Sequence, residues 1–218
     1  MLEPLYNFKN QFSYLPYIEN NKHKDNKSFV VCGMGGSAIS ARILKDMFAD
    51  ISIDIHSDYG VPEKYVKKQT LVIISSFSGN TEETLDAYSV AIKKGYRVGV
   101  VTSGGALLES AKRDRTPYVQ IPSGELEPRF TVGYQMLALL ELMSLPVYRD
   151  RLMEAGKSID EESCNQAGLH MAEYCGNKYP SIYTGKLMEG TFYAIVAAVH
   201  EGAKRPSVLR VLPESNHN

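Results

Sequence analysis

The chain has 218 residues, of which 44% are hydrophobic and 22% charged, and its formal net charge is −1. This composition is typical of a soluble globular protein and argues against a disordered or fibrous chain. The near-neutral charge provides no basic surface for nucleic acid. No apolar run approaches the roughly 20 residues that a membrane helix needs, so we expect no membrane association.

The N-terminal stretch and the cysteines indicate a cytoplasmic protein. Residues 1–12 lack a basic segment followed by an apolar one, so we expect no signal peptide. Cys32, Cys164 and Cys175 are an odd number of cysteines without the spacing of a zinc site. We therefore expect reduced thiols and no metal site.

The first part of the chain alternates short apolar runs with helical segments, after loosely helical apolar spacing in residues 1–20. The predicted strands are 28–32, 52–56, 71–75, 97–102 and 118–121, and the predicted helices are 40–50, 81–94 and 106–114. Apolar strands that alternate with helices are typical of a parallel sheet covered on both faces. We predict a doubly wound α/β domain over residues 1–148.

The second part repeats this alternation but holds fewer strands. An apolar helix over 130–144 and a helical stretch over 149–176 precede two predicted strands, at 180–185 and 207–212, and a helix at 188–202. A self-standing sheet needs more than two strands. We therefore predict an incomplete second α/β unit over 149–218, completed by other segments or by a partner.

Two polar turns follow predicted strands. They are CGMGGSAIS at 32–40 and SSFSGNTEETL at 75–85, and each combines glycine and hydroxyl residues where a helix begins. The first turn of a helix has free N–H groups and a partial positive charge, and small hydroxyl residues add donors without bulk. At the carboxyl ends of parallel strands this combination predicts a phosphate site. We expect Ser76, Ser78 and Thr81 on one side of the phosphate and Ser37 on the other.

Two other interpretations of these turns stay open. Ser78, Asn80 or Thr81 would also serve as ordinary helix caps, with Glu83 or Thr84 completing the cap. Residues 33–38 fit the dinucleotide pattern G-x-G-x-x-A, with Asp54 or Asp58 as the acidic residue that binds the ribose. The dinucleotide interpretation leaves the second turn unexplained.

The sequence resembles the SIS (sugar isomerase) domain proteins and, among them, the bifunctional phosphoglucose/phosphomannose isomerases. The matching segments are GMGGSAIS, SSFSGNTEETL, EPRFTVGY (127–134), HEGAKRP (200–206) and ESNHN (214–218). The resemblance implies an aldose–ketose isomerase of hexose 6-phosphates, acting on glucose 6-phosphate, fructose 6-phosphate and potentially mannose 6-phosphate through a cis-enediol. It also implies a homodimer that needs no metal ion or organic cofactor.

The resemblance assigns roles to particular residues. Glu201 matches the base that moves the proton, His217 the residue that opens the sugar ring, and Arg129 the cation that stabilises the enediolate. The phosphate-binding positions fall on Gly36, Ser37, Ser76, Ser78 and Thr81.

Plainer interpretations of the three catalytic candidates stay open. Glu201 would be a solvated residue at a helix end, His217 an idle residue of a polar tail, and Arg129 an ion-pair partner of Glu125 or Glu127. The family continues past the segment that ESNHN matches. We therefore expect one of two arrangements. Either the chain is a shortened member that isomerises poorly or is a non-catalytic module that only binds sugar phosphates, or a partner subunit completes its site.

Overall fold

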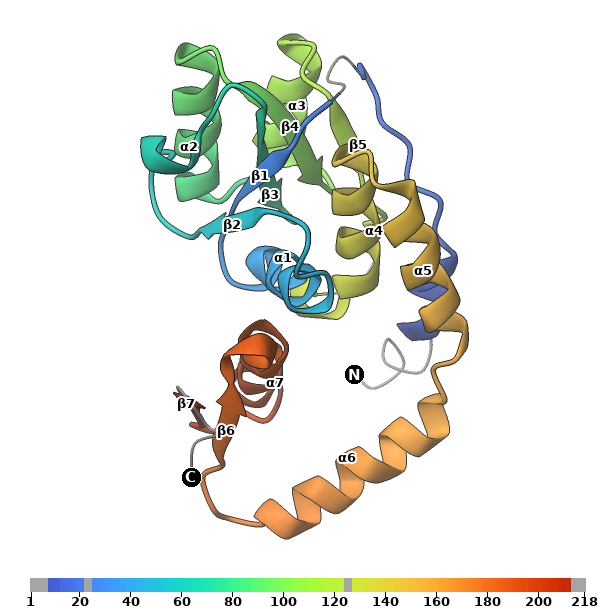
Figure 1. Cartoon of the computed structure of the whole chain (residues 1–218). Coiled ribbons are helices and arrows are strands. Elements are labelled where there is room, and N and C mark those ends of the chain that lie inside the picture. Colours follow the sequence, from blue (N-terminus) through green and yellow to red (C-terminus); the bar gives the residue numbers. More distant parts are fainter. Residues whose placement is uncertain (1–7, 22–24, 124–126, 213–218) are drawn as a thin grey trace.

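A computed structural model describes residues 8–21, 25–123 and 127–212 of the chain. Within them, five parallel strands form one sheet in the order β2-β1-β3-β4-β5 (Figure 1). The strands are β1 (Ser28–Gly33), β2 (Ile53–His56), β3 (Thr70–Ser76), β4 (Arg97–Thr102) and β5 (Tyr118–Gln120).

Helices cover both faces of this sheet. Helices α1 and α4 lie on one face and α2 and α3 on the other, and α5 packs beside α4 (Figure 1). Their bounds are α1 (Gly36–Met47), α2 (Glu82–Lys93), α3 (Gly105–Arg113), α4 (Val132–Leu142) and α5 (Pro146–Lys157). The predicted doubly wound α/β fold is confirmed.

The apolar strands divide their side chains between two cores. In β1, Phe29 and Val31 pack with α1 and α4, whereas Val30 and Cys32 pack against α2 and α3. All seven residues of β3 are buried. Each fully buried Val, Leu or Ile contributes roughly 1.5–3 kcal/mol, so this two-sided burial explains why the strands are continuously apolar rather than alternating.

Helix α1 begins earlier than predicted. The sequence analysis started it at residue 40, but it begins at Gly36, after a bend in which Gly35 has a φ of +49°. A positive φ is readily adopted by glycine and rarely by other residues. As a result, Ser37 belongs to the first turn of α1, at the positive end of the helix dipole.

The single helical stretch predicted for 149–176 is wrong. The structure has two helices there, α5 and α6 (Glu161–Cys175), and Asp160 caps the second by accepting a hydrogen bond from the Ser163 N–H. Leu152 is buried in the core of the first unit, and Gly156 lies against Phe12. The predicted boundary at residue 148 thus falls inside α5, and we propose that the first unit extends through this helix.

The second unit packs its helix on the first unit. It consists of β6 (Ser181–Gly185), α7 (Glu189–Gly202) and β7 (Val208–Leu212), and in the described residues β6 and β7 pair only with each other, in parallel. At the start of α7, Asp46 of α1 accepts hydrogen bonds from the Thr191 N–H and hydroxyl, at 2.7 and 3.0 Å. Gly190 lies so close to the Arg42 backbone that a Cβ would come within 2.5 Å of the Arg42 carbonyl oxygen. The second unit is therefore held against α1 through the first turn of α7.

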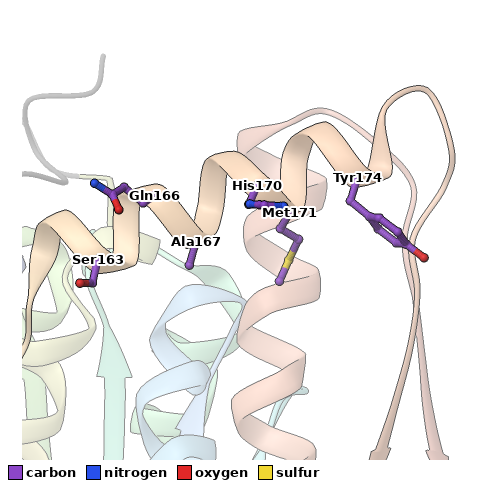
Figure 2. A pocket seen from close by; sticks show the side chains of 6 residues that line it. All are labelled: Ser163, Gln166, Ala167, His170, Met171 and Tyr174. Atoms are coloured by element: carbon purple, nitrogen blue, oxygen red, sulfur yellow. The ribbon is translucent and has the colours of Figure 1, made fainter.

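Helix α6 connects the two units and is largely exposed to solvent. None of its residues, all of which the structure describes, is buried. Ser163, Gln166, Ala167, His170, Met171 and Tyr174 line a shallow hollow along it (Figure 2). Neither α6 nor another helix in the described part of the chain has the length and apolar character needed to cross a membrane.

The burial of Cys32 predicts an unreactive thiol. Burial raises the pKa of Cys32 to about 12, and the thiolate is the form that reacts. Cys164 is exposed. Labelling of the native protein with iodoacetamide near neutral pH should modify Cys164 and spare Cys32, as peptide mass mapping would show. Fast modification of native Cys32 would contradict the two-sided core, and denatured protein is the positive control.

Candidate functional site

The two polar turns lie side by side at one edge of the sheet. Strands β1 and β3 are neighbours, with Gly33 opposite Ser75 at their carboxyl ends. Strand β2 lies on the other side of β1, so the strand order reverses at this point. Ligands of open α/β sheets bind at such a reversal, outside the carboxyl ends of the strands.

Hydrogen bonds join the two turns directly. The Ser37 Oγ accepts a hydrogen bond from the Phe77 N–H at 3.0 Å, and the Ser75 Oγ donates to the Ser37 carbonyl at 3.2 Å. Because the Ser37 Oγ accepts in this bond, its own proton stays available for an anion. The link fixes Ser37 next to the turn that follows β3.

The turn after β3 presents further hydroxyl groups. The Ser78 Oγ accepts from the Asn80 N–H at 3.2 Å, which again leaves the hydroxyl proton available. The Ser76 Oγ accepts from the Gly79 N–H at 3.1 Å and lies 3.2 Å from the Thr81 Oγ1. Thr81 is the cap residue of α2, but in the described part of the chain its hydroxyl makes no cap hydrogen bond. The structure thus shows Thr81 beside Ser76 rather than as a side-chain cap of α2.

A third turn, which the sequence analysis missed, supports the second. A Cβ on Gly79, whose φ is +67°, would lie 1.8 Å from the Gly104 carbonyl oxygen, so only glycine fits there. The Asn80 Oδ1 accepts from the Ala106 N–H, and the Gly79 carbonyl accepts from the Leu107 N–H, both at 2.9 Å. The glycine pair that follows β4 was the available signal for this contact.

The predicted residues meet around a hollow of about 200 Å³, which we call the central hollow. Its lining consists of Met34, Gly36, Ser37, Phe77, Ser78, Thr81, Pro128, Arg129 and Glu201. The structure therefore brings four of the five predicted phosphate-binding residues together with two catalytic candidates. Ser76 is buried and bonded to the turn rather than being part of the lining. His217 lies outside the described residues.

Arg129 and Glu201 form an ion pair at the wall of the central hollow. Arg129 lies in the short 3-10 turn η4 (Pro128–Phe130), and its Nη1 donates to the Glu201 Oε2 at 3.0 Å. Arg129 also pairs with Glu127, as the plainer interpretation predicted. Its side chain is 17% exposed, against 47% for Glu201. Because an acidic residue near the C-terminus of a helix such as α7 is disfavoured, the arginine offsets an unfavourable charge.

His200, which precedes Glu201, faces another part of the molecule. Its Nε2 lies 2.8 Å from both the backbone nitrogen and the carbonyl oxygen of Ser207. The histidine thereby links the end of α7 to the segment that leads into β7. This geometry agrees with leaving His200 out of the predicted site.

The strand order disfavours the dinucleotide interpretation. The order β2-β1-β3-β4-β5 is that of flavodoxin-like sheets, whereas the common dinucleotide-binding fold has the order 3-2-1-4-5-6. Among residues 8–21, 25–123 and 127–212, no three His, Cys, Asp or Glu side chains form a group that could hold a metal ion.

Comparison with known proteins identifies the family. No protein-family model matches the chain. A bifunctional phosphoglucose/phosphomannose isomerase of Caldicellulosiruptor bescii is 34% identical over 244 aligned positions, which cover 100% of this chain and 70% of the relative. The chain belongs to the bifunctional phosphoglucose/phosphomannose isomerase family.

Two further comparisons define the extent of the match. The family member of Thermoplasma acidophilum is 35% identical over 193 residues, 88% of this chain and 60% of the relative. The chain thus spans 60–70% of the length of these two relatives. The C-terminal domain of a glucosamine-fructose-6-phosphate aminotransferase from Francisella tularensis superposes with a TM-score of 0.63, at 14% identity, over 100% of this chain and 71% of that chain. That likeness shows the SIS-type fold.

The different positions of Ser76 and Ser78 predict different effects of mutation. Ser76→Ala removes the acceptor of the Gly79 N–H and should lower the free energy of unfolding by about 1–2 kcal/mol in urea denaturation. Ser78→Ala should leave stability nearly unchanged, because water can replace the lost acceptor of the exposed Asn80 N–H, and it should weaken the binding of inorganic phosphate roughly tenfold in calorimetry. Unchanged phosphate affinity in Ser78→Ala would contradict a ligand role for this hydroxyl.

Proposed function

We propose that the protein interconverts glucose 6-phosphate and fructose 6-phosphate, and also accepts mannose 6-phosphate, through a cis-enediol. The observation that carries this proposal is that phosphate-type donors and the Arg129–Glu201 pair line the same hollow. The names of the relatives support this substrate class. The relatives are longer than this chain, so the activity rests on the family and on the residues described here.

The phosphate group would bind between the first turns of α1 and α2. Ser37, Ser78 and Thr81, each of which carries a hydroxyl group, are among the residues that line the central hollow. Each helix start adds a partial positive charge, equivalent to roughly half an elementary charge. Together these groups favour a dianionic monoester, and they bind a part of the substrate that does not react.

Glu201 and Arg129 would carry the proton transfer. In the opened aldose, the Glu201 carboxylate removes the proton from C2, the electron pair of that C–H bond forms the C1–C2 double bond, and the C1 carbonyl oxygen becomes negative. Arg129, whose Nη1 donates to Glu201 at 3.0 Å, would stabilise this oxygen. The proton of the C2 hydroxyl then moves to the C1 oxygen, the C2 carbonyl forms, and Glu201 returns its proton to C1, which completes the ketose. No electrons leave the substrate, so the reaction needs no redox partner.

The proposals for ring opening and for assembly start from the resemblance to the family. His217, which the resemblance assigns to ring opening, lies outside the described residues. We further propose a cytoplasmic homodimer, in which a partner covers the exposed second unit. In this unit Tyr183 and Leu187 are 61% and 79% exposed, and exposed large apolar side chains support an interface.

A mutation of Glu201 tests the proposal. Glu201→Gln keeps the shape of the side chain and removes the base, so kcat for fructose 6-phosphate should fall by about 10²–10⁴-fold in a coupled assay. Binding of fructose 6-phosphate, measured by calorimetry, should remain. Glu189→Gln is the matched control, because Glu189 is an exposed glutamate at the opposite end of the same helix.

The same experiment distinguishes the enzyme from the binding module. Binding of fructose 6-phosphate without turnover in the unmutated protein would support the non-catalytic module. Turnover that survives Glu201→Gln unchanged would contradict the assignment of the base.

A further inference from the structure

Two buried glutamines hold the turn that carries Arg129. Gln11 and Gln135 are 2% and 1% exposed. A buried amide is unfavourable unless it is hydrogen-bonded, so the partners of such a side chain indicate its purpose. Both glutamines direct their hydrogen bonds to the segment from Pro128 to Gly133.

Gln135 holds the residue before Arg129. From α4, its Nε2 donates to the Pro128 carbonyl at 3.1 Å and to the Thr131 Oγ1 at 2.8 Å. The Thr131 hydroxyl in turn donates to the Pro128 carbonyl at 2.8 Å. The carbonyl of the peptide that leads into Arg129 therefore accepts two side-chain hydrogen bonds.

Gln11 holds the residue after Arg129. It lies in the N-terminal 3-10 turn η2 (Phe8–Ser13), and its Nε2 donates to the Phe130 carbonyl at 2.5 Å. Its Oε1 accepts from the Gly133 N–H at 3.0 Å. Gly133 is in the first turn of α4, so Gln11 satisfies one of the N–H groups that a helix start leaves unpaired. A Cβ on Gly133 would lie 2.7 Å from the Gln11 Cβ, so glycine is needed for this approach.

The start of α1 packs against the opposite side of the turn that carries Arg129. A Cβ on Gly36 would lie 3.2 Å from the Arg129 nitrogen and 3.3 Å from the Pro128 carbonyl carbon. The backbone of Arg129 is therefore confined between the first turn of α1, which lines the central hollow, and the two glutamines in the core. Movement of this turn would change the position of the guanidinium relative to the phosphate-type donors.

We propose that Gln11 and Gln135 are positioning residues, which hold the Arg129 guanidinium where negative charge develops during isomerisation. The inference rests on the proposed isomerase function. Stabilisation of a developing charge depends steeply on the placement of the donor, and a displacement of about 1 Å can cost a hundredfold in rate. Phosphate binding on α1 and α2 does not use these glutamines. Their loss should therefore change kcat rather than KM.

The test compares three variants of the full chain. Gln135→Met and Gln11→Met keep the approximate length of the side chain and remove its hydrogen bonds. Tyr88→Phe is the control, because the buried Tyr88 hydroxyl lies within hydrogen-bond distance of Asp114 and Thr116, at 3.0 and 2.8 Å, on the other face of the sheet. All three should lower the melting temperature. Only the two glutamine variants should lower kcat for fructose 6-phosphate, by roughly 10- to 100-fold, with KM unchanged.

A second readout does not need turnover. The Arg129 Nε is buried and has no hydrogen-bond partner among the described residues. Burial should therefore slow the exchange of its N–H proton with water in ¹⁵N NMR, and the signal can be assigned through its loss in Arg129→Lys. Exchange should accelerate in both glutamine variants and stay slow in Tyr88→Phe.

The outcomes separate the two proposals. Unchanged kcat and unchanged Arg129 exchange in the glutamine variants would overturn the positioning role, even if their melting temperatures fall. A parallel rise in KM would overturn it as well, because it would mean general damage to the site. If the unmutated protein shows no turnover, the proposed function fails, and the Arg129 exchange rates alone decide the positioning role.

Discussion

The geometry of the candidate site depends on the hydrogen bond between the Ser37 hydroxyl and the Phe77 backbone N–H. It joins the turn after β1 to the turn after β3, at the only place where the strand order of the described sheet reverses. Because serine is the acceptor in this bond, the link and an available hydroxyl proton coexist. The first turns of α1 and α2 and their hydroxyl groups are thereby held around the central hollow. Each role that we propose for a residue of the site is defined relative to this hollow.

The second unit contributes to the site through its packing on α1. Glu201 lies 72 positions after Arg129 in the chain, yet their side chains meet at 3.0 Å. The contact exists because α7 lies against α1, held where Asp46 accepts hydrogen bonds from Thr191. The second unit, which has two paired strands in its described residues, therefore supplies the proposed base.

Local patterns predicted the sheet and both polar turns, because buried parallel strands are continuously apolar and helix starts need small polar residues. The strand predicted at 71–75, for example, is Thr70–Ser76 in the structure. The break between α5 and α6 was missed although its signals are present, because Gly156 lies in the last turn of α5 and Asp160 is a cap residue followed by Glu161 and Glu162. Gln11 could not be found either, since its partners Phe130 and Gly133 lie 119 and 122 positions away. Gln135 bonds to Pro128 and Thr131, seven and four positions away, but the sequence does not show that this side chain is buried. The roles of the site residues remain predictions, as does that of His217.

A crystal structure with bound fructose 6-phosphate tests the central claim most directly. The account predicts that the phosphate lies between the first turns of α1 and α2, within hydrogen-bond distance of the Ser37 and Ser78 hydroxyls, with C1 and C2 of the sugar directed toward Glu201. A sugar phosphate that binds elsewhere, for example along α6, while the central hollow holds no phosphate, would contradict it.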